Sequence, residues 1–66
     1  MPDLAAIYAA LIAGQHGEVL AAALPAEGTA DRARVHAWRA QSLRALGRPR
    51  EGAMELIHAI RITKML

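Results

Sequence analysis

The chain has 66 residues, a formal net charge of +2, and a composition that is 55% hydrophobic but only 3% aromatic. So short a chain forms one domain with a thin core, and the absence of cysteine excludes disulfide bonds. Because no run of β-branched or aromatic residues has a period of two, strands are not expected, and the alanine-rich sequence predicts an all-α fold over residues 1–66.

Two helices are predicted in the first half of the chain. The first runs from about Asp3 to Ala13, and Gly14 suits the position that follows a helix. The second runs from about Gly17 to Leu24, where Pro25 stops it. The first helix is apolar on nearly every side, so part of its burial is expected to come from a partner. Its expected partner-binding residues share one face at helical spacing and are Leu4, Tyr8 and Leu11.

The second half predicts a tight antiparallel pair of helices, from Ala30 to Leu46 and from Pro49 to Lys64. Gly47 suits the left-handed position after a helix, and Pro49 suits the first position of the next one. The linker is so short that the two helices must lie side by side. Two separate apolar stripes on the third helix predict two neighbours, and Trp38 is expected to anchor it to the fourth helix. The predicted core comprises Val35, Trp38, Leu43, Leu46, Leu56, Ile57 and Ile60.

Three apolar residues near the end of the fourth predicted helix lie away from this core. They are expected to be exposed and to bind a partner, and they are Ile62, Met65 and Leu66. Together with the apolar first helix, they favour a protein partner or a homo-oligomer.

Charge is distributed unevenly between the two halves. Residues 1–30 carry three acidic residues and no Lys or Arg, whereas residues 31–66 carry all eight basic residues. Solvated helix faces explain this distribution most simply, and an acidic partner or nucleic acid is the alternative. Against nucleic acid, the basic residues point in several directions, and Glu51 and Glu55 are expected on the outward face of the last helix.

No catalytic, cofactor-binding or metal-binding set is expected. The three histidines, His16, His36 and His58, lack ligand spacing and are expected to be solvated. Ser42 is interpreted as a packing residue without a neighbouring base. We therefore expect no enzyme and no cofactor. The longest apolar run, from Leu4 to Ala13, is too short to span a bilayer, and no signal peptide is recognised, which predicts a cytoplasmic protein without a membrane partner.

The segment LRALGRPREGAMELIHA, residues 43–59, resembles the turn and second helix of a tetratricopeptide repeat. On this resemblance Ala40 and Gly52 take the small slots of the two helices, and Leu43 and Leu56 take large ones. Arg39 and Lys64 depart from the family pattern, which has leucine and proline there. An offset of 33 residues relates Gly14 to Gly47 and Glu18 to Glu51, which indicates a degenerate first hairpin (3–25) before the better-formed one (30–64).

The resemblance implies two antiparallel hairpins in a right-handed stack, used for protein–protein interaction. The alanine-, arginine- and glycine-rich composition suggests a small bacterial adaptor or chaperone. The GQHGE and LRALGR turns are similar to those of miniature co-chaperones of type III secretion subunits, which hold an amphipathic helix. The alternative is a nucleic-acid-binding regulator that resembles a helix-turn-helix protein and uses the basic second half.

Overall fold

The computed structural model describes residues 3–66, and within that range the chain forms four α-helices and no strand. The helices are α1 (Leu4–Ile12), α2 (His16–Ala21), α3 (Ala30–Ala45) and α4 (Pro49–Met65). The prediction of an all-α fold is confirmed. The predicted ends of α1, α3 and α4 lie within one residue of the observed ends.

Helix α2 ends three residues earlier than predicted, at Ala21. Ala22 already has extended backbone, with φ −67° and ψ 145°. Pro25 restricts Leu24 to extended conformations, and both Ala22 and Leu24 pack against the core. The residues that were predicted as the last turn of α2 therefore form an extended segment that covers the core.

Short polar residues begin two of the helices. The Asp3 carboxylate accepts a hydrogen bond from the Ala6 N–H at 3.1 Å, and the Thr29 hydroxyl accepts one from the Arg32 N–H at 3.2 Å. Each side chain supplies an acceptor for an N–H group that has no partner within its helix. Thr29 therefore caps α3 through its own side chain.

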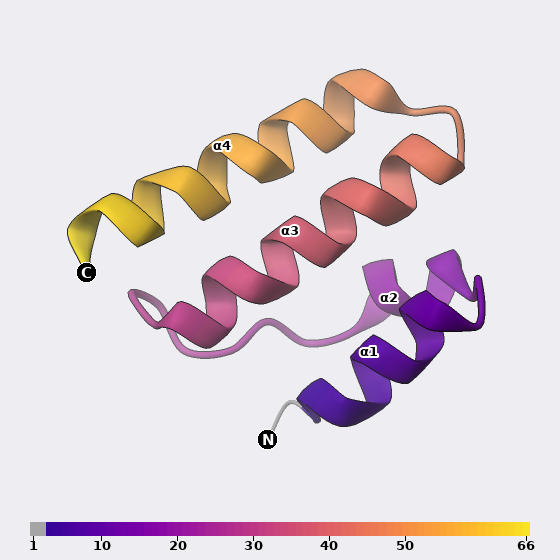
Figure 1. The fold of residues 1–66 in the computed structure, drawn as a ribbon, viewed down its shortest axis with the longest axis horizontal. Coiled ribbons are helices and arrows are strands. Elements are labelled where there is room, and N and C mark those ends of the chain that lie inside the picture. Colours follow the sequence, from indigo (N-terminus) through magenta and orange to yellow (C-terminus); the bar gives the residue numbers. More distant parts are fainter. Residues whose placement is uncertain (1–2) are drawn as a thin grey trace.

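Helix α3 lies in the middle of the molecule, between α4 and α1, with α2 farther back (Figure 1). It packs against all three other helices, which confirms that it has more than one neighbour. Within residues 3–66, α4 packs against α3 alone. The resulting molecule is flat, measuring 30 × 27 × 15 Å, and one long side of α4 has no neighbour among the described residues.

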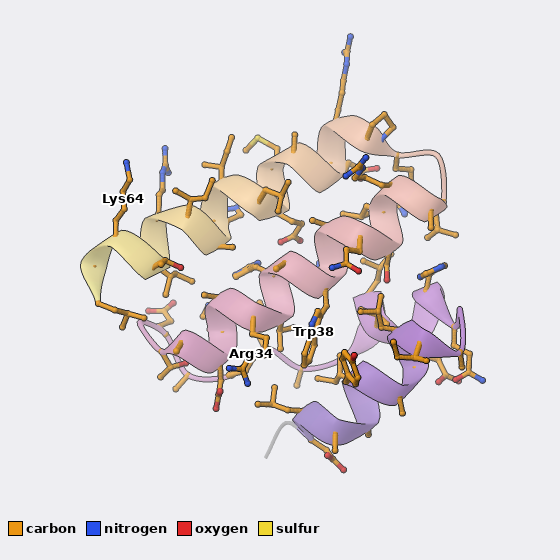
Figure 2. The ribbon with its side chains drawn as sticks, in the orientation of Figure 1. Arg34, Trp38 and Lys64 are labelled. Atoms are coloured by element: carbon orange, nitrogen blue, oxygen red, sulfur yellow. The ribbon has the colours of Figure 1, made fainter. Side chains whose placement is uncertain are left out.

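The apolar core lies between α1, α2 and α3. Half-buried residues, which include Leu4 and Leu11, pack against its buried residues. The buried residues are Ile7, Ala10, Val19 and Val35. Trp38 also packs against this core, and its ring lies 5.4 Å from that of Tyr8. Figure 2 shows Trp38 pointing toward α1. The expectation that Trp38 anchors α3 to α4 was therefore wrong.

Small residues form the interface between α3 and α4. Gly52 and Ala59 of α4 are buried, and a Cβ atom at Gly52 would lie 3.1 Å from the Ala40 carbonyl oxygen. At about 100° per residue, Gly52 and Ala59 share one side of the helix, whereas Ile60 and Ile57 lie roughly 80° and 140° away from Gly52. The backbones thus approach closely along a glycine-alanine stripe, and the larger side chains are excluded from it.

This geometry corrects the predicted core. Val35 and Leu43 are buried as expected. Four other members of the set are substantially exposed, with exposed fractions of 47%, 40%, 40% and 54% for Leu46, Leu56, Ile57 and Ile60.

The two hairpin turns are built alike at an offset of 33 residues. Gly14 and Gly47 both have a φ of 76°, in the left-handed region that a side chain disfavours. The Gln15 N–H donates to the Ala10 carbonyl at 2.9 Å, and the Arg48 N–H donates to the Leu43 carbonyl at 2.8 Å. The first residues of α2 and α4, His16 and Pro49, follow at the same offset. The predicted roles of Gly47 and Pro49 are therefore confirmed.

Candidate functional site

Seven exposed residues occupy the side of α4 that faces away from α3. At about 100° per residue they lie within an arc of roughly 120° centred on Ile57. Figure 2 shows one of them, Lys64, projecting away from α3. We call this surface the outer face of α4, and it comprises Arg50, Ala53, Met54, Ile57, Ile60, Arg61 and Lys64.

The outer face is apolar along its middle and positively charged at both ends. Met54, Ile57 and Ile60 are 55%, 40% and 54% exposed. Arg50 lies in the first turn, and Arg61 and Lys64 lie toward the end of the helix. No ion pair involves these three cations within residues 3–66. An amphipathic surface of this kind suits a partner that is both apolar and acidic.

The two acids of α4 lie outside the outer face. Glu51 pairs with Arg48, whose Nη2 donates to Glu51 Oε1 at 2.7 Å. Glu55 turns back toward α3, and only 13% of its side chain is exposed. The expectation that both acids lie on the outward face of α4 was therefore wrong for Glu55, because buried donors on α3 attract its carboxylate.

Glu55 is the centre of a buried ionic cluster, which we call the polar seam. His36 Nδ1 lies 2.6 Å from Glu55 Oε2, and Arg39 Nε donates to Glu55 Oε1 at 2.7 Å. A carboxylate only accepts hydrogen bonds, so Nδ1 of His36 carries the proton. Arg39 Nη1 also donates at 2.8 Å to the carbonyl of Leu20, in the last turn of α2. Arg39 thereby connects α2, α3 and α4.

The position of His36 in the polar seam differs from a second expectation. His36 is buried, and its ring stacks on that of His58 with centroids 5.1 Å apart. His36 was expected to be solvated. The antiparallel pairing of α3 with α4 brings it to Glu55, 19 positions away in the sequence.

The environment of Glu55 lowers the pKa of its carboxyl. Burial alone would raise this pKa, but hydrogen bonds and charge from Arg39 and His36 together bring it below the ordinary value of 4.5. A carboxyl with a lowered pKa stabilises the fold at pH values above its unfolded-state pKa. That contribution is lost as the pH falls through the folded-state pKa.

The lowered pKa predicts a pH-dependent difference in the free energy of unfolding between the wild-type protein and Glu55→Gln. At pH 6 the wild type is expected to be more stable, and the gap should close as the pH falls below about 4.5. Urea unfolding followed by circular dichroism at a series of pH values measures it. Comparing the two proteins at each pH removes only the Glu55 carboxyl and keeps the rest of the chain the same. A gap of constant size down to about pH 2.5 would contradict a charged Glu55 in the seam.

Ser42 has a neighbouring base, contrary to expectation. His16 Nδ1 lies 2.9 Å from Ser42 Oγ. Ser42 is fully buried, however, with none of its surface exposed to solvent. Its hydroxyl cannot meet a substrate in this conformation, so the pair serves to connect the first turn of α2 to α3.

The predicted partner-binding residues fall into two groups. Leu4 and Leu11 are half-buried against the core, and Ile62 is also half-buried. Tyr8, Met65 and Leu66 are 50%, 84% and 69% exposed. The outer face of α4 was missed because Ile57 and Ile60 had been assigned to the core, and the 100° spacing relative to Gly52 is the signal that separates them.

Residues 3–66 hold no group of three or more His, Cys, Asp or Glu side chains placed to bind a metal ion. In the part of the chain that the structure describes, no helix is both long and apolar enough to cross a membrane. The chain matches no known family model, and neither a curated protein nor a solved structure shows significant similarity to it.

Proposed function

We propose that this protein is a non-catalytic protein–protein interaction module, a small adaptor or chaperone that binds through the outer face of α4. The observation that carries the proposal is the exposure of Met54, Ile57 and Ile60 in the middle of one helix face. Large aliphatic side chains that are contiguous and exposed are typical of binding surfaces. In the part of the chain that the structure describes, α4 has α3 as its single neighbour, so a partner can reach the outer face along its length.

The proposal includes a tetratricopeptide-like arrangement of two hairpins. Its support is the 33-residue offset, which relates both the glycine turns and the first residues of α2 and α4. Further support comes from Gly52 and Ala40, the proposed small slots, which lie against each other. Units of this kind bury their faces against neighbouring units, and the exposed outer face of α4 is a surface on which such a neighbour could pack.

Photo-crosslinking tests the proposed function. A photoreactive residue at Met54, on the outer face, is expected to capture a discrete partner in extracts of the source organism, or a second copy of the chain. Adding Ile60→Asp should abolish the capture, because it places a charge in the apolar middle of the face. Ile60 is 54% exposed, so the variant should keep its helical circular dichroism.

The matched control carries the photoreactive residue at Glu18, an exposed position on α2. Equal capture from both positions, or capture at Met54 that survives Ile60→Asp, would contradict the proposal. Sedimentation velocity at micromolar concentration then shows whether the protein associates with itself.

Binding to nucleic acid is the second candidate, and one observation favours it. Because Glu55 is turned into the seam and Glu51 pairs with Arg48, the outer face has cations but no acid. Its apolar middle has no counterpart in a phosphate backbone, which places this candidate second. Filter binding of a DNA duplex across a range of salt concentrations separates the two, because an affinity that falls steeply with salt would favour nucleic acid.

A further inference from the structure

The chemistry of the partner can be inferred from the order of charges along the outer face. This inference rests on the proposed function. Arg50 lies eleven residues before Arg61 and fourteen before Lys64. At 1.5 Å per residue, these intervals are about 16 and 21 Å. Between them, Ala53, Met54, Ile57 and Ile60 provide apolar contact. The face therefore has two positive ends separated by three to four helical turns.

We propose that the occupant of this face is an acidic amphipathic helix of another protein. It carries an apolar stripe about three turns long, with Asp or Glu in the turns at both ends. Its apolar stripe covers the middle of the outer face. Its terminal acids meet Arg50 at one end and Arg61 and Lys64 at the other, where none of the three cations has an ion-pair partner within the described chain.

The same charges argue against a second copy of the chain at this site. Arg50 and Lys64 are each seven residues from Ile57. An antiparallel pair of α4 helices centred on Ile57 would therefore set Arg50 of one copy beside Lys64 of the other, at both ends. Like charges opposed across an interface weaken it, and the outer face has no acid to offset them.

A membrane surface fits the face less well. Interfacial helices carry aromatic residues such as Trp and Phe on the apolar side. Helix α4 contains no Trp, Tyr or Phe. Glu55 is also held against α3 by Arg39, so the helix stays on α3 rather than turning its full circumference to lipid.

Fluorescence anisotropy with designed peptides tests this. The probe is a labelled helical peptide of about 18 residues with a leucine stripe and glutamates in its first and last turns. Against the full chain, it is expected to bind at least about tenfold more tightly than the same peptide with glutamine at those positions. A third peptide, with the glutamates moved to the middle turns, should also bind more weakly.

Protein variants complete the test. Replacing Arg50, Arg61 and Lys64 together by alanine should weaken binding of the glutamate peptide about tenfold and reduce its salt dependence. The matched control is Arg34→Ala, which removes an exposed arginine of α3 that lies outside the outer face and should leave the affinity unchanged. The circular dichroism of each variant verifies its fold.

The outcomes separate the inference from the proposed function. If the glutamine peptide binds as tightly as the glutamate peptide, and Ile60→Asp abolishes both, the acidic partner is wrong and the apolar docking surface stands. If no peptide binds, or if anionic phosphatidylglycerol vesicles or a DNA duplex bind more tightly, the inference is overturned. A dimer that Ile60→Asp dissociates also overturns it, because a second copy then occupies the face.

Discussion

Arg39→Leu is expected to lower the free energy of unfolding by about 3 kcal/mol, because it breaks a largely buried ion pair and leaves the Glu55 carboxylate without its guanidinium partner. Glu55 would keep only His36 as a hydrogen-bond partner, and the Leu20 carbonyl would lose the donor that Arg39 Nη1 supplies. A chain of this size has a total stability of only about 3–5 kcal/mol. The variant should therefore keep only about 0–2 kcal/mol of stability, so that a substantial fraction of the molecules can be unfolded at room temperature.

Urea unfolding followed by circular dichroism measures the effect, and Arg34→Leu is the matched control on the same helix. Arg34 approaches Asp31 at 3.9 Å, with both side chains more than half exposed. Exposed pairs contribute little, so this control should change stability by no more than about 0.5 kcal/mol. Equal losses in the two variants would show that the polar seam does not stabilise the fold.

A milder substitution keeps the test quantitative if Arg39→Leu does not fold. Arg39→Lys retains the positive charge but lacks the planar guanidinium that reaches Glu55 and Leu20 together. Its stability should fall between those of the wild type and Glu55→Gln. The order of the variants then reports how much of the effect depends on the connection between α2 and α4.

The sequence predicts this fold well where local chemistry decides the structure. Gly47 with Pro49 sets the turn between α3 and α4, and Thr29 caps α3 through its own side chain. These features depend on residues a few positions apart, whose preferences act before any tertiary contact forms. The end of α2 was less predictable, because the extended segment from Ala22 is held by packing against residues of distant helices.

The candidate site was harder to predict because it depends on which side of α4 faces α3. Apolar periodicity points to Leu56, Ile57 and Ile60 as the buried side. The close approach of Gly52 to Ala40 instead turns α4 so that its small residues face α3. The same rotation carries Glu55 to His36 and Arg39. The resemblance assigns Gly52 and Ala40 to small slots. Aligning α4 on α3 with these two residues in contact predicts the positions of both the polar seam and the outer face.

Because Gly52 lies in close contact with α3, Gly52→Leu is the second substitution with a large expected effect. It should lower the free energy of unfolding by about 3 kcal/mol. A Cβ atom at Gly52 would lie 3.1 Å from the Ala40 carbonyl oxygen and 3.2 Å from Cγ of Arg44. The Arg44 side chain can move aside, but the carbonyl belongs to the backbone of α3. A leucine must therefore push the two helices apart, and overpacking of this kind is strongly destabilising.

The matched control is Gly17→Leu, in α2, where a Cβ atom meets nothing within 4 Å and the backbone has ordinary helical geometry. Leucine has a better helix propensity than glycine, so this variant should be as stable as the wild type or slightly more stable. Thermal unfolding of the two variants compares the same residue exchange with and without a facing helix. If Gly52→Leu melted near the Gly17→Leu variant, α3 and α4 would not be in close contact at Gly52. The rotation that exposes the outer face of α4 would then lose its physical basis.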